Sequence, residues 1–365
     1  MKKAIFALTA LAFIAVSCES ESPEETNDLT IQEVQVDMSD FYVYTDDIDT
    51  FESTAKGNSG KSCHTMKVLN QKLKENPGLE QKMYNIEKNL RTFIASKKPD
   101  KPGNGNGNGG GGDGGDGGDP PVDDGLGSIT IPVIVHVLYN TSAQNISDQQ
   151  IASQIAVLND DFNAANNDIN QVPSLFSGVV GDIDINFVLD QTIRKATSRT
   201  SFGTNDAIKF DSQGGSNVVT PDTHLNIWVG NIGGGILGYA QFPGGSASTD
   251  GVVVSPQYFG TSGIATAPFD GGRTTTHEVG HWLNLRHIWG DGRCNRDDFV
   301  SDTPRSDRPN YGCPSFPTVH CRTTDMTMNY MDYVDDDCMF MFSEGQKERM
   351  RALFAAGGPR DGFLP

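Results

Sequence analysis

The chain has 365 residues and a formal net charge of -19 at pH 7, from 47 acidic and 28 basic side chains. Phosphate binding needs clustered Lys and Arg, and the sequence has no basic stripe, so nucleic acid is excluded as a partner. Hydrophobic residues make up 36% of the chain, diluted by 41 glycines, which fits one substantial soluble domain with accessory segments, or two modest domains.

Residues 1–18 resemble a bacterial export signal, with a short positive start and an apolar stretch over 4–16 that is too short to span a bilayer stably. The stretch ends at Ala15-Val16-Ser17-Cys18, which is similar to a lipobox except that Ala15 replaces the usual Leu. Cys18 is therefore the expected lipid anchor and the only membrane contact, with a plain cleaved secretory signal as the alternative. Both interpretations predict an extracytoplasmic protein, secreted or on the outer surface of a bacterium.

Three segments precede the main domain. Residues 19–62 are acidic and rich in Ser and Thr, so we expect them to be weakly ordered. Apolar residues recur at three- and four-residue steps over 63–96, and the break at Pro77-Gly78 predicts two helices. Residues 97–125 contain Gly-Asn and Gly-Gly-Asp repeats that cannot form a core, which predicts a flexible linker.

The main domain spans residues 126–365. It begins with a strand over Ile129–Tyr139, and Ser147 with Gln150 predicts a capping box at the start of the next helix. Further strands are expected over Asp184–Leu189, Leu225–Val229 and Gly251–Ser255, and helices over Arg273–Leu283 and from a Ser343 cap through Phe354. Strands alternating with helices, followed by a loop-rich C-terminal half, predict an α/β sheet domain with an irregular lower part.

The string His277-Glu278-Val279-Gly280-His281, followed by His287, carries the chemistry. Two histidines four residues apart lie on one face of a helix, so both imidazoles can reach one zinc ion. Glu278 is not needed as a ligand and can act as the general base that takes a proton from the attacking water. The alternative is a helix with three unrelated histidines.

The pattern H-E-x-x-H-x-x-G-x-x-H is the metzincin signature, and Asn284 stands at its glycine. That glycine lets the chain turn sharply out of the helix with a positive φ, which Asn tolerates best among the other residues. Metzincins also carry a methionine turn beneath the metal, and the segment Met328–Tyr333 is similar to it. The resemblance implies that Met331 forms an apolar floor under the imidazoles and that Tyr333 stabilises the oxyanion; taken alone, Met331 would be interpreted as core packing.

Together with the string from Trp282 to Asp291, these features resemble the pappalysin or cytophagalysin family of metzincins over about residues 126–360. The resemblance implies a twisted mixed sheet, an active-site helix and an irregular C-terminal subdomain. It also implies that Gly238, Tyr239 and Ala240 lie on an edge strand that pairs with an extended substrate.

These parts predict a zinc endopeptidase acting on proteins or peptides. Three neutral imidazoles leave zinc an open position for water, Glu278 takes its proton, and no covalent intermediate forms. Two other functions stay open: a binding or adhesin lipoprotein with a vestigial metal site, and a zinc hydrolase acting on non-peptide amides.

The cysteines divide by location. Cys294, Cys313, Cys321 and Cys338 flank the active-site loops in an oxidising compartment and form no C-x-x-C pair, which predicts two disulfides rather than a second zinc site. Three connectivities are open from the sequence, and the resemblance favours Cys294 with Cys321 and Cys313 with Cys338.

Cys63 is left over, and an unpaired thiol outside the cell needs a reason. The resemblance implies that a cysteine followed two residues later by Thr ligates zinc in the pro-segment, so the protein would be made as a latent zymogen. A free or dimer-forming thiol is the alternative.

Acidic residues near the site supply two further hypotheses. The family binds structural calcium in the loop after Cys294, so Asp298 and Thr303 are the candidate Ca²⁺ ligands, against a merely solvated acidic loop. Asp337 follows the methionine turn, where the chain lines the S1′ pocket in metzincins. An acid there would favour Arg or Lys directly after the scissile bond.

Overall fold

The structure, a computed structural model, describes residues 34–45, 63–98 and 123–364. Residues Gln35–Pro365 form one compact unit, and the other unit, Met1–Val34, contributes only Val34 to the description. Cys18 and most of the segments 19–62 and 97–125 lie outside the described residues. None of the described helices is long and apolar enough to cross a membrane.

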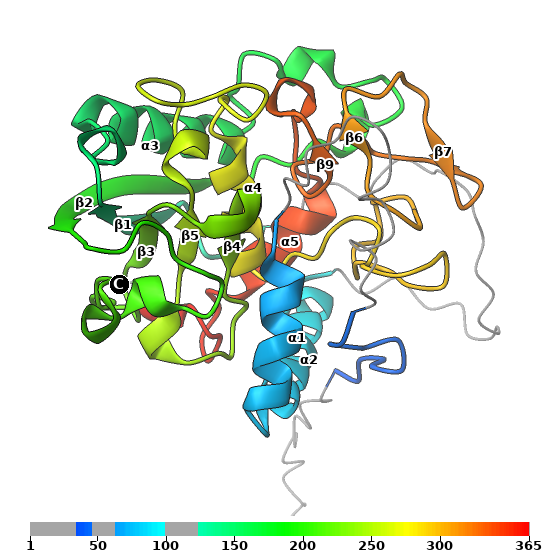
Figure 1. The fold of residues 1–365 in the computed structure, drawn as a ribbon. Coiled ribbons are helices and arrows are strands. Elements are labelled where there is room, and N and C mark those ends of the chain that lie inside the picture. Colours follow the sequence, from blue (N-terminus) through cyan, green and yellow to red (C-terminus); the bar gives the residue numbers. More distant parts are fainter. Residues whose placement is uncertain (1–33, 46–62, 99–122, 365) are drawn as a thin grey trace, which may run out of the picture. The chain divides into compact units, whose positions relative to one another are not determined.

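A five-stranded mixed sheet in the order β2-β1-β3-β5-β4 forms the centre of this unit (Figure 1). Its strands are β1 (Ile129–Tyr139), β2 (Ile185–Ala196), β3 (Leu225–Val229), β4 (Gly238–Ala240) and β5 (Val252–Val254). All neighbours pair in parallel except β4, which runs antiparallel to β5 and forms one edge. The predicted α/β sheet is confirmed.

Strand β2 is longer than the expected Asp184–Leu189. It pairs with β1 along its whole length, from Ile129 opposite Ile185 to Tyr139 opposite Ala196. Its second half is polar and mostly exposed because it lies at the other edge of the sheet, so hydrophobic patterning alone does not mark it as a strand.

Alternating side chains of the strands enter two different clusters. Val133, Val135 and Ile227 point to the face covered by α3 (Asp148–Phe162) and α4 (Arg273–Trp282). Trp228 and Val253 point the other way, because each is next in its strand to a residue of the first cluster. They pack on the opposite face with residues from the loops around 202–208 and 232–236. Both faces of the sheet are therefore buried, as expected for a mainly parallel sheet.

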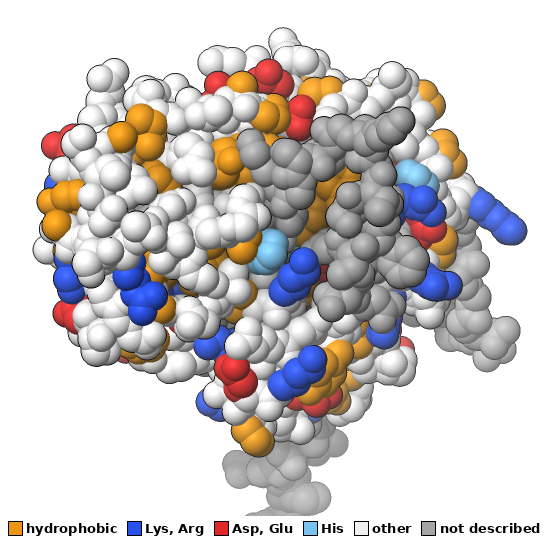
Figure 2. Space-filling view, viewed as in Figure 1, with side chains coloured by type: hydrophobic (Ala, Val, Ile, Leu, Met, Phe, Trp, Pro, Cys, Tyr) orange, Lys and Arg blue, Asp and Glu red, His pale blue; other side chains and the backbone are white. Residues whose placement is uncertain are grey.

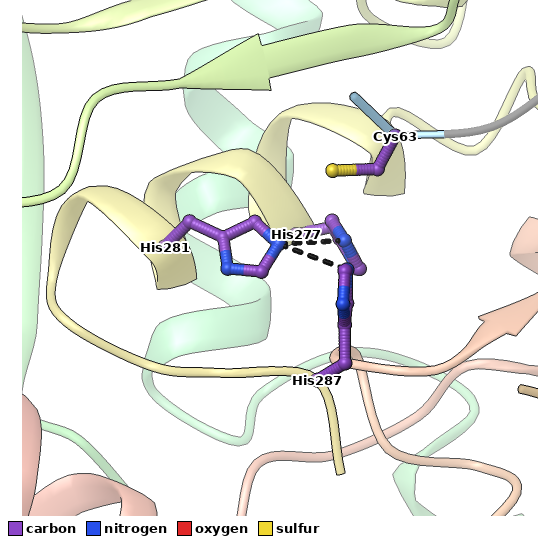
Figure 3. A group of neighbouring side chains, drawn as sticks. All are labelled: Cys63, His277, His281 and His287. Carbon is purple, nitrogen blue, oxygen red and sulfur yellow. Dashed lines mark hydrogen bonds between the residues drawn. The ribbon is translucent and has the colours of Figure 1, made fainter. Parts of the chain in front are cut away.

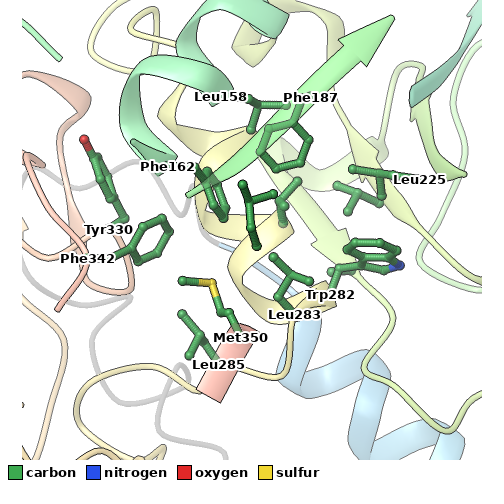
Figure 4. Close-up of a cluster of buried hydrophobic side chains, with 14 of the residues drawn as sticks. Leu158, Phe162, Phe187, Leu225, Trp282, Leu283, Leu285, Tyr330, Phe342 and Met350 are labelled. Atoms are coloured by element: carbon green, nitrogen blue, oxygen red, sulfur yellow. The ribbon is translucent and has the colours of Figure 1, made fainter. Parts of the chain in front are cut away.

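The main cluster joins the sheet, α3, α4 and the C-terminal half. Figure 4 shows Leu158 and Phe162 of α3 close to Phe187 of β2, with Phe342 on the other side. The rings of Phe162 and Phe342 lie 4.9 Å apart. The Ser147 hydroxyl accepts from the Gln150 amide at the start of α3, but the Gln150 side chain donates to the Pro256 and Phe259 carbonyls instead. The predicted cap is present and the reciprocal half of the capping box is not.

The C-terminal half is irregular. It contains α5 (Glu344–Ala352) and four two-residue strands: β6 (Tyr311–Gly312) pairs with β9 (Tyr333–Val334), and β7 (Val319–His320) pairs with β8 (Thr323–Thr324). The predicted Ser343 cap is present at the start of α5, where Ser343 and Gln346 form a capping box, and the helix ends at Ala352, before the expected Phe354.

Two helices precede the sheet, α1 (Thr65–Glu75) and α2 (Leu79–Lys97), separated at Pro77-Gly78 as predicted. Their apolar faces are buried against the sheet edge and α5, while Lys and Arg side chains appear over these helices on the outer surface (Figure 2). A buried ion pair fixes α2: both Arg349 Nη atoms of α5 donate to the Glu87 carboxylate at 3.0 and 2.8 Å.

Candidate active site

Helix α4 carries His277, Glu278 and His281, and a distant carboxylate fixes its first turn. Its N-cap is Gly272, which has no side chain to accept from the free amides. Asp336 takes this role, because one of its carboxylate oxygens accepts from the Gly271 and Arg273 amides at 2.9 and 3.2 Å. Asp336 is buried, and burial raises its pKa to about 7.

The chain leaves α4 through Asn284, which has φ 68°. The Leu285 amide donates to the Gly280 carbonyl and the Asn284 amide to the His281 carbonyl, both at 2.9 Å. This is the Schellman pattern, in which the residue after the cap adopts the left-handed conformation. Asn284 therefore makes the turn predicted for the signature glycine, and His287 returns to the other two histidines.

His277, His281 and His287, the histidine cluster, point their Nε2 atoms at one another (Figure 3). The His281 Nε2 lies 3.1 Å from Nε2 of both other residues. Four-coordinate zinc with nitrogens at about 2.0–2.1 Å separates neighbouring ligands by about 3.3 Å, close to this spacing. Burial lowers the pKa of His277 to about 3 and lowers that of His281, so both imidazoles are neutral at pH 7.

The other ring nitrogen of each histidine faces an acceptor. His277 Nδ1 lies 2.7 Å from the Tyr330 carbonyl and His281 Nδ1 lies 2.8 Å from the Leu285 carbonyl. The third contact joins His287 Nδ1 to the Asp291 carboxylate. Because each acceptor requires the proton on Nδ1, all three Nε2 lone pairs converge without a hydrogen between them. Such an arrangement is repulsive unless a cation binds there, so these residues fit a zinc ion.

Met331 lies directly beneath α4. It is fully buried, and a Cβ atom added at Gly280 would meet its sulfur at 2.5 Å. The thioether therefore packs where Gly280 leaves room, which requires glycine at this position of the helix. Met331 thus packs against the helix that carries His277 and His281, and its role as the floor under the imidazoles stays a prediction.

Glu278 is buried beside the histidine cluster, and burial raises its pKa to about 7. Its Oε2 accepts from the Thr65 hydroxyl at 2.6 Å, whereas no hydrogen bond to Oε1 is formed within the described residues. The sequence did not predict this contact between α1 and the general-base candidate. Gly238 approaches Glu278 closely, since a Cβ added there would lie 3.0 Å from Glu278 Cγ.

Cys63 lies against the same site. Its sulfur and the three imidazole nitrogens all lie within 4.8 Å of one another, and Figure 3 shows it beside the cluster. Cys63 pairs in parallel with Gly238 of β4, and the His64 amide donates to the Gly238 carbonyl at 3.0 Å. The Tyr333 hydroxyl donates to the Cys63 carbonyl at 3.3 Å, and the Tyr333 ring contacts those of His277 and His287, so it presents a hydrogen-bond donor beside the histidine cluster. Among the described residues, Cys63 is the free cysteine.

The edge strand β4 is present as predicted, but its side chains differ in exposure. Tyr239 is fully buried in the cluster around Trp228, so only its backbone lies at the edge. The Ala240 amide donates to the Thr65 hydroxyl at 2.7 Å. The edge that was expected to pair with substrate is therefore occupied here by residues 63–65 of the chain itself.

A pocket opens beside His277 and Glu278, and its acidic lining differs from the prediction. Asp332, Asp335 and Asp336 line it, together with Arg273, Leu237, Phe269 and Tyr333. Asp337 is exposed and lies outside this lining, because the 3-10 turn Asp336–Cys338 turns Asp336 inward and Asp337 outward. The amides at the start of α4 occupy Asp336, and the backbone amide and side chain of Asn310 occupy Asp332, so Asp335 is the carboxylate left to face a ligand.

The four cysteines predicted to form disulfides connect the loops of the C-terminal half. Disulfides join Cys294 to Cys321 and Cys313 to Cys338, which confirms the crossed pairing.

Asp298 is buried, and the Thr303 hydroxyl lies 2.8 and 2.9 Å from its two oxygens. Burial, followed by the charge of Asp297, raises the pKa of Asp298 well above its usual value. Among the described residues Asp298 makes no ion pair with a Lys, Arg or His side chain, so this buried carboxylate and the Thr303 hydroxyl could hold a hard cation such as Ca²⁺.

Known proteins share this arrangement. Residues 220–355 match the model of the peptidase M43 family, described as Pregnancy-associated plasma protein-A. Extracellular metalloprotease 1 of Coccidioides posadasii is 34% identical over 238 residues, covering 62% of this chain and 77% of that protein. An extracellular metalloprotease of Pyricularia oryzae is also 34% identical, covering 62% of this chain and 76% of the relative.

Solved structures extend the likeness. Mature mirolysin of Tannerella forsythia in complex with a cleaved peptide is 49% identical, with a TM-score of 0.64, and covers 65% of this chain and 96% of that chain. A promirolysin mutant from the same organism is 40% identical, with a TM-score of 0.70, and covers 83% of this chain and 97% of that chain. The match to the pro-form therefore extends over more of the chain than the match to the mature form.

Proposed function

The chain belongs to the pappalysin (M43) family of metzincin-like metallopeptidases, and from this premise we propose that the histidine cluster holds the catalytic zinc of an endopeptidase made as a latent zymogen. The observation that carries the proposal is the convergence of the Nε2 atoms of His277, His281 and His287 beside Glu278. Bound zinc would act as a Lewis acid and lower the pKa of a water molecule at its open position to about 7.

The chain's own residues supply the remaining chemistry. Glu278, once Thr65 has left, accepts the proton of the attacking water and passes it to the leaving amine. The Tyr333 hydroxyl then donates to the developing oxyanion instead of to the Cys63 carbonyl. The backbone of Gly238 and Ala240 pairs with the peptide and holds its scissile bond in place.

The test compares the full-length chain with its Glu278→Ala variant after activation. Casein or gelatin degradation should disappear in the variant while both proteins bind one zinc per chain, measured by elemental analysis. Equal degradation by both proteins would refute the role of Glu278. Zinc binding without any proteolysis by the unmodified chain would instead favour the binding-lipoprotein function.

We further propose that Cys63 keeps the enzyme latent, with residues 63–96 as the pro-segment and 126–365 as the catalytic domain. The Cys63 sulfur lies within 4.8 Å of the imidazole nitrogens, which supports it as the fourth zinc ligand, and Thr65 engages the general base at the same time. The variant Cys63→Ala should show premature proteolysis during expression. Combining it with Glu278→Ala separates self-cleavage from unfolding, and unchanged latency of Cys63→Ala would contradict the switch.

The pocket lined by Asp335 supports a preference for Arg or Lys directly after the scissile bond. Asp335 carries the free carboxylate there, whereas Asp337 faces solvent. We expect Asp335→Asn to reduce the ratio of kcat/KM for Arg over Gln at this position by about tenfold, and Asp337→Asn to leave the ratio nearly unchanged. A preference for apolar residues at this position would refute the proposal.

Calcium at Asp298 and Thr303 and an extracytoplasmic location complete the proposal. Calcium should raise the thermal unfolding temperature of the chain, and Asp298→Asn should abolish that increase. The relatives' names, extracellular metalloproteases, support export of this chain. Labelling with radioactive palmitate, lost in Cys18→Ser, would test lipid anchoring against simple secretion.

A further inference from the structure

Asp206 is a buried carboxylate at the contact between the pro-segment and the catalytic domain. Its exposed fraction is 2%, and it stands at φ 59° just before the turn Ala207–Lys209. Its Oδ2 lies 2.8 Å from Lys72 Nζ of α1, and its Oδ1 lies 3.1 Å from Lys209 Nζ. Neither zinc ligation nor the proton transfer by Glu278 uses this group.

Asp206 binds two cations in the zymogen, and only one belongs to the catalytic domain. Lys209 also donates to the Thr249 carbonyl at 2.6 Å, and its ammonium lies 5.3 and 5.2 Å from the ring centres of Trp228 and Tyr239. The ammonium group of Lys209 therefore contacts three kinds of group: the Asp206 carboxylate, a backbone carbonyl and two aromatic rings. Lys209 does not saturate the Asp206 carboxylate, because Oδ1 accepts no hydrogen bond of good geometry and Oδ2 faces α1. The carboxylate can therefore bind a second cation.

The pair lines a hollow that extends toward the histidine cluster. Lys72, Asp206 and Lys209 line this hollow of about 580 Å³ between α1 and the chain that continues from β4, together with Gln241 and Phe242. Phe242 also contacts the imidazole of His281, at 5.4 Å between ring centres. The hollow therefore adjoins the zinc site, and it opens fully only when both α1 and α2 leave, because Leu79, Lys82 and Met83 of α2 also line it.

The position of the hollow along β4 determines which part of a bound substrate the hollow faces. The pocket of Asp335 includes Leu237, just before β4, whereas the hollow is lined by Ala240, the last residue of β4, and by residues between there and Thr249. The two lie on opposite sides of the zinc site along the same edge strand. If the pocket of Asp335 takes the residue after the scissile bond, the hollow takes residues before that bond.

We propose that Asp206 binds the ammonium or guanidinium group of a substrate Lys or Arg on the N-terminal side of the scissile bond, and that Lys72 occupies this place in the zymogen. Lys72 follows Thr65 by seven residues, which is about 10 Å along a helix. An extended peptide covers that distance in about three residues, so the basic residue stands third or fourth before the bond. This inference rests on the proposed function.

The experiment uses the full-length chain after activation and a set of peptides with Arg at the position after the scissile bond. Arg or its neutral isostere citrulline is placed at each of the four positions before the bond. We expect kcat/KM to be about tenfold higher for Arg at the third or fourth position, the size of a hydrogen-bonded charge contact. Asp206→Asn should reduce that ratio to about one. The control Asp211→Asn removes a surface carboxylate that pairs with Lys195, and should keep the ratio.

The outcomes separate cleanly. An arginine preference that persists in Asp206→Asn overturns the proposal. If that variant fails to fold, the unmodified enzyme still decides, because equal rates for Arg and citrulline at all four positions also overturn it. Cleavage without this preference leaves the endopeptidase function intact, whereas no cleavage of any peptide, as in Glu278→Ala, refutes the proposed function itself.

Discussion

The ion pair between Glu87 of α2 and Arg349 of α5 should be a main clamp on the pro-segment. Glu87 is 2% exposed and receives bonds from Arg349 and from Arg91, the latter at 2.8 Å. Burial alone would raise the pKa of Glu87, but the charge of Arg349 holds it at about 2, against 4.5 for a free side chain. With about 1.4 kcal/mol for each pKa unit, the carboxylate stabilises the docked helix by about 3 kcal/mol.

We therefore expect Glu87→Gln to accelerate hydrogen exchange of the α2 amides. Removing one partner of a buried pair leaves the other charge uncompensated and destabilises by about 3–5 kcal/mol, in agreement with the first value. A loss of about 3 kcal/mol corresponds to about 150-fold faster exchange. The measurement is made at pH 7 in a Glu278→Ala background, which prevents self-cleavage.

The matched control is Glu348→Gln, also on the α5 side of this contact. Glu348 lies 3.8 Å from Lys98 and both side chains are largely exposed, so its loss should change exchange by no more than about threefold. If Glu87→Gln changed the exchange of α2 as little as this control does, the ion pair would not be the clamp.

The pH dependence of this clamp has a definite sign. The folded-state pKa of Glu87 is depressed, so its contribution is fully present above about pH 5 and disappears as the pH falls toward about 2. The difference between the parent and Glu87→Gln should therefore shrink over this range. A difference that grew on acidification would contradict the assignment.

Substitutions at three further positions test the zinc site. Gly280→Ala places a methyl group 2.5 Å from the Met331 sulfur and should lower the free energy of unfolding by about 1–3 kcal/mol in urea denaturation; no loss would show that the methionine turn yields easily. Asp291→Asn weakens the partner of His287 Nδ1 and should reduce zinc affinity about 10–100-fold in a chelator competition, whereas unchanged affinity would assign Asp291 to the loop alone. Asn284→Gly should keep both zinc and stability, while Asn284→Val should lose about 1–3 kcal/mol at φ 68°, measured by thermal unfolding; equal behaviour of the two would contradict the turn geometry.

Local patterns predicted the elements well. Strand Ile129–Tyr139 and strand Leu225–Val229 have the expected bounds, because continuous apolar runs mark strands that are buried on both faces. The break at Pro77-Gly78 and the cap at Ser343 were equally readable, since both depend on residues a few positions apart. The predicted contribution of Gln150 to a capping box was wrong, because its side chain donates to carbonyl groups more than a hundred positions away in the chain.

The sequence by itself determined the zinc-ligand pattern, because His277 and His281 stand one helical turn apart whatever surrounds them, and Asn284 can make the turn that returns His287. Only the tertiary structure decided the role of each aspartate near the site. Asp336 caps α4 and Asp337 faces solvent although they are neighbours, and Asp206 meets Lys72 across the cleft. The role of a carboxylate depends on burial and on partners far away in the chain, and neither is encoded in its neighbours.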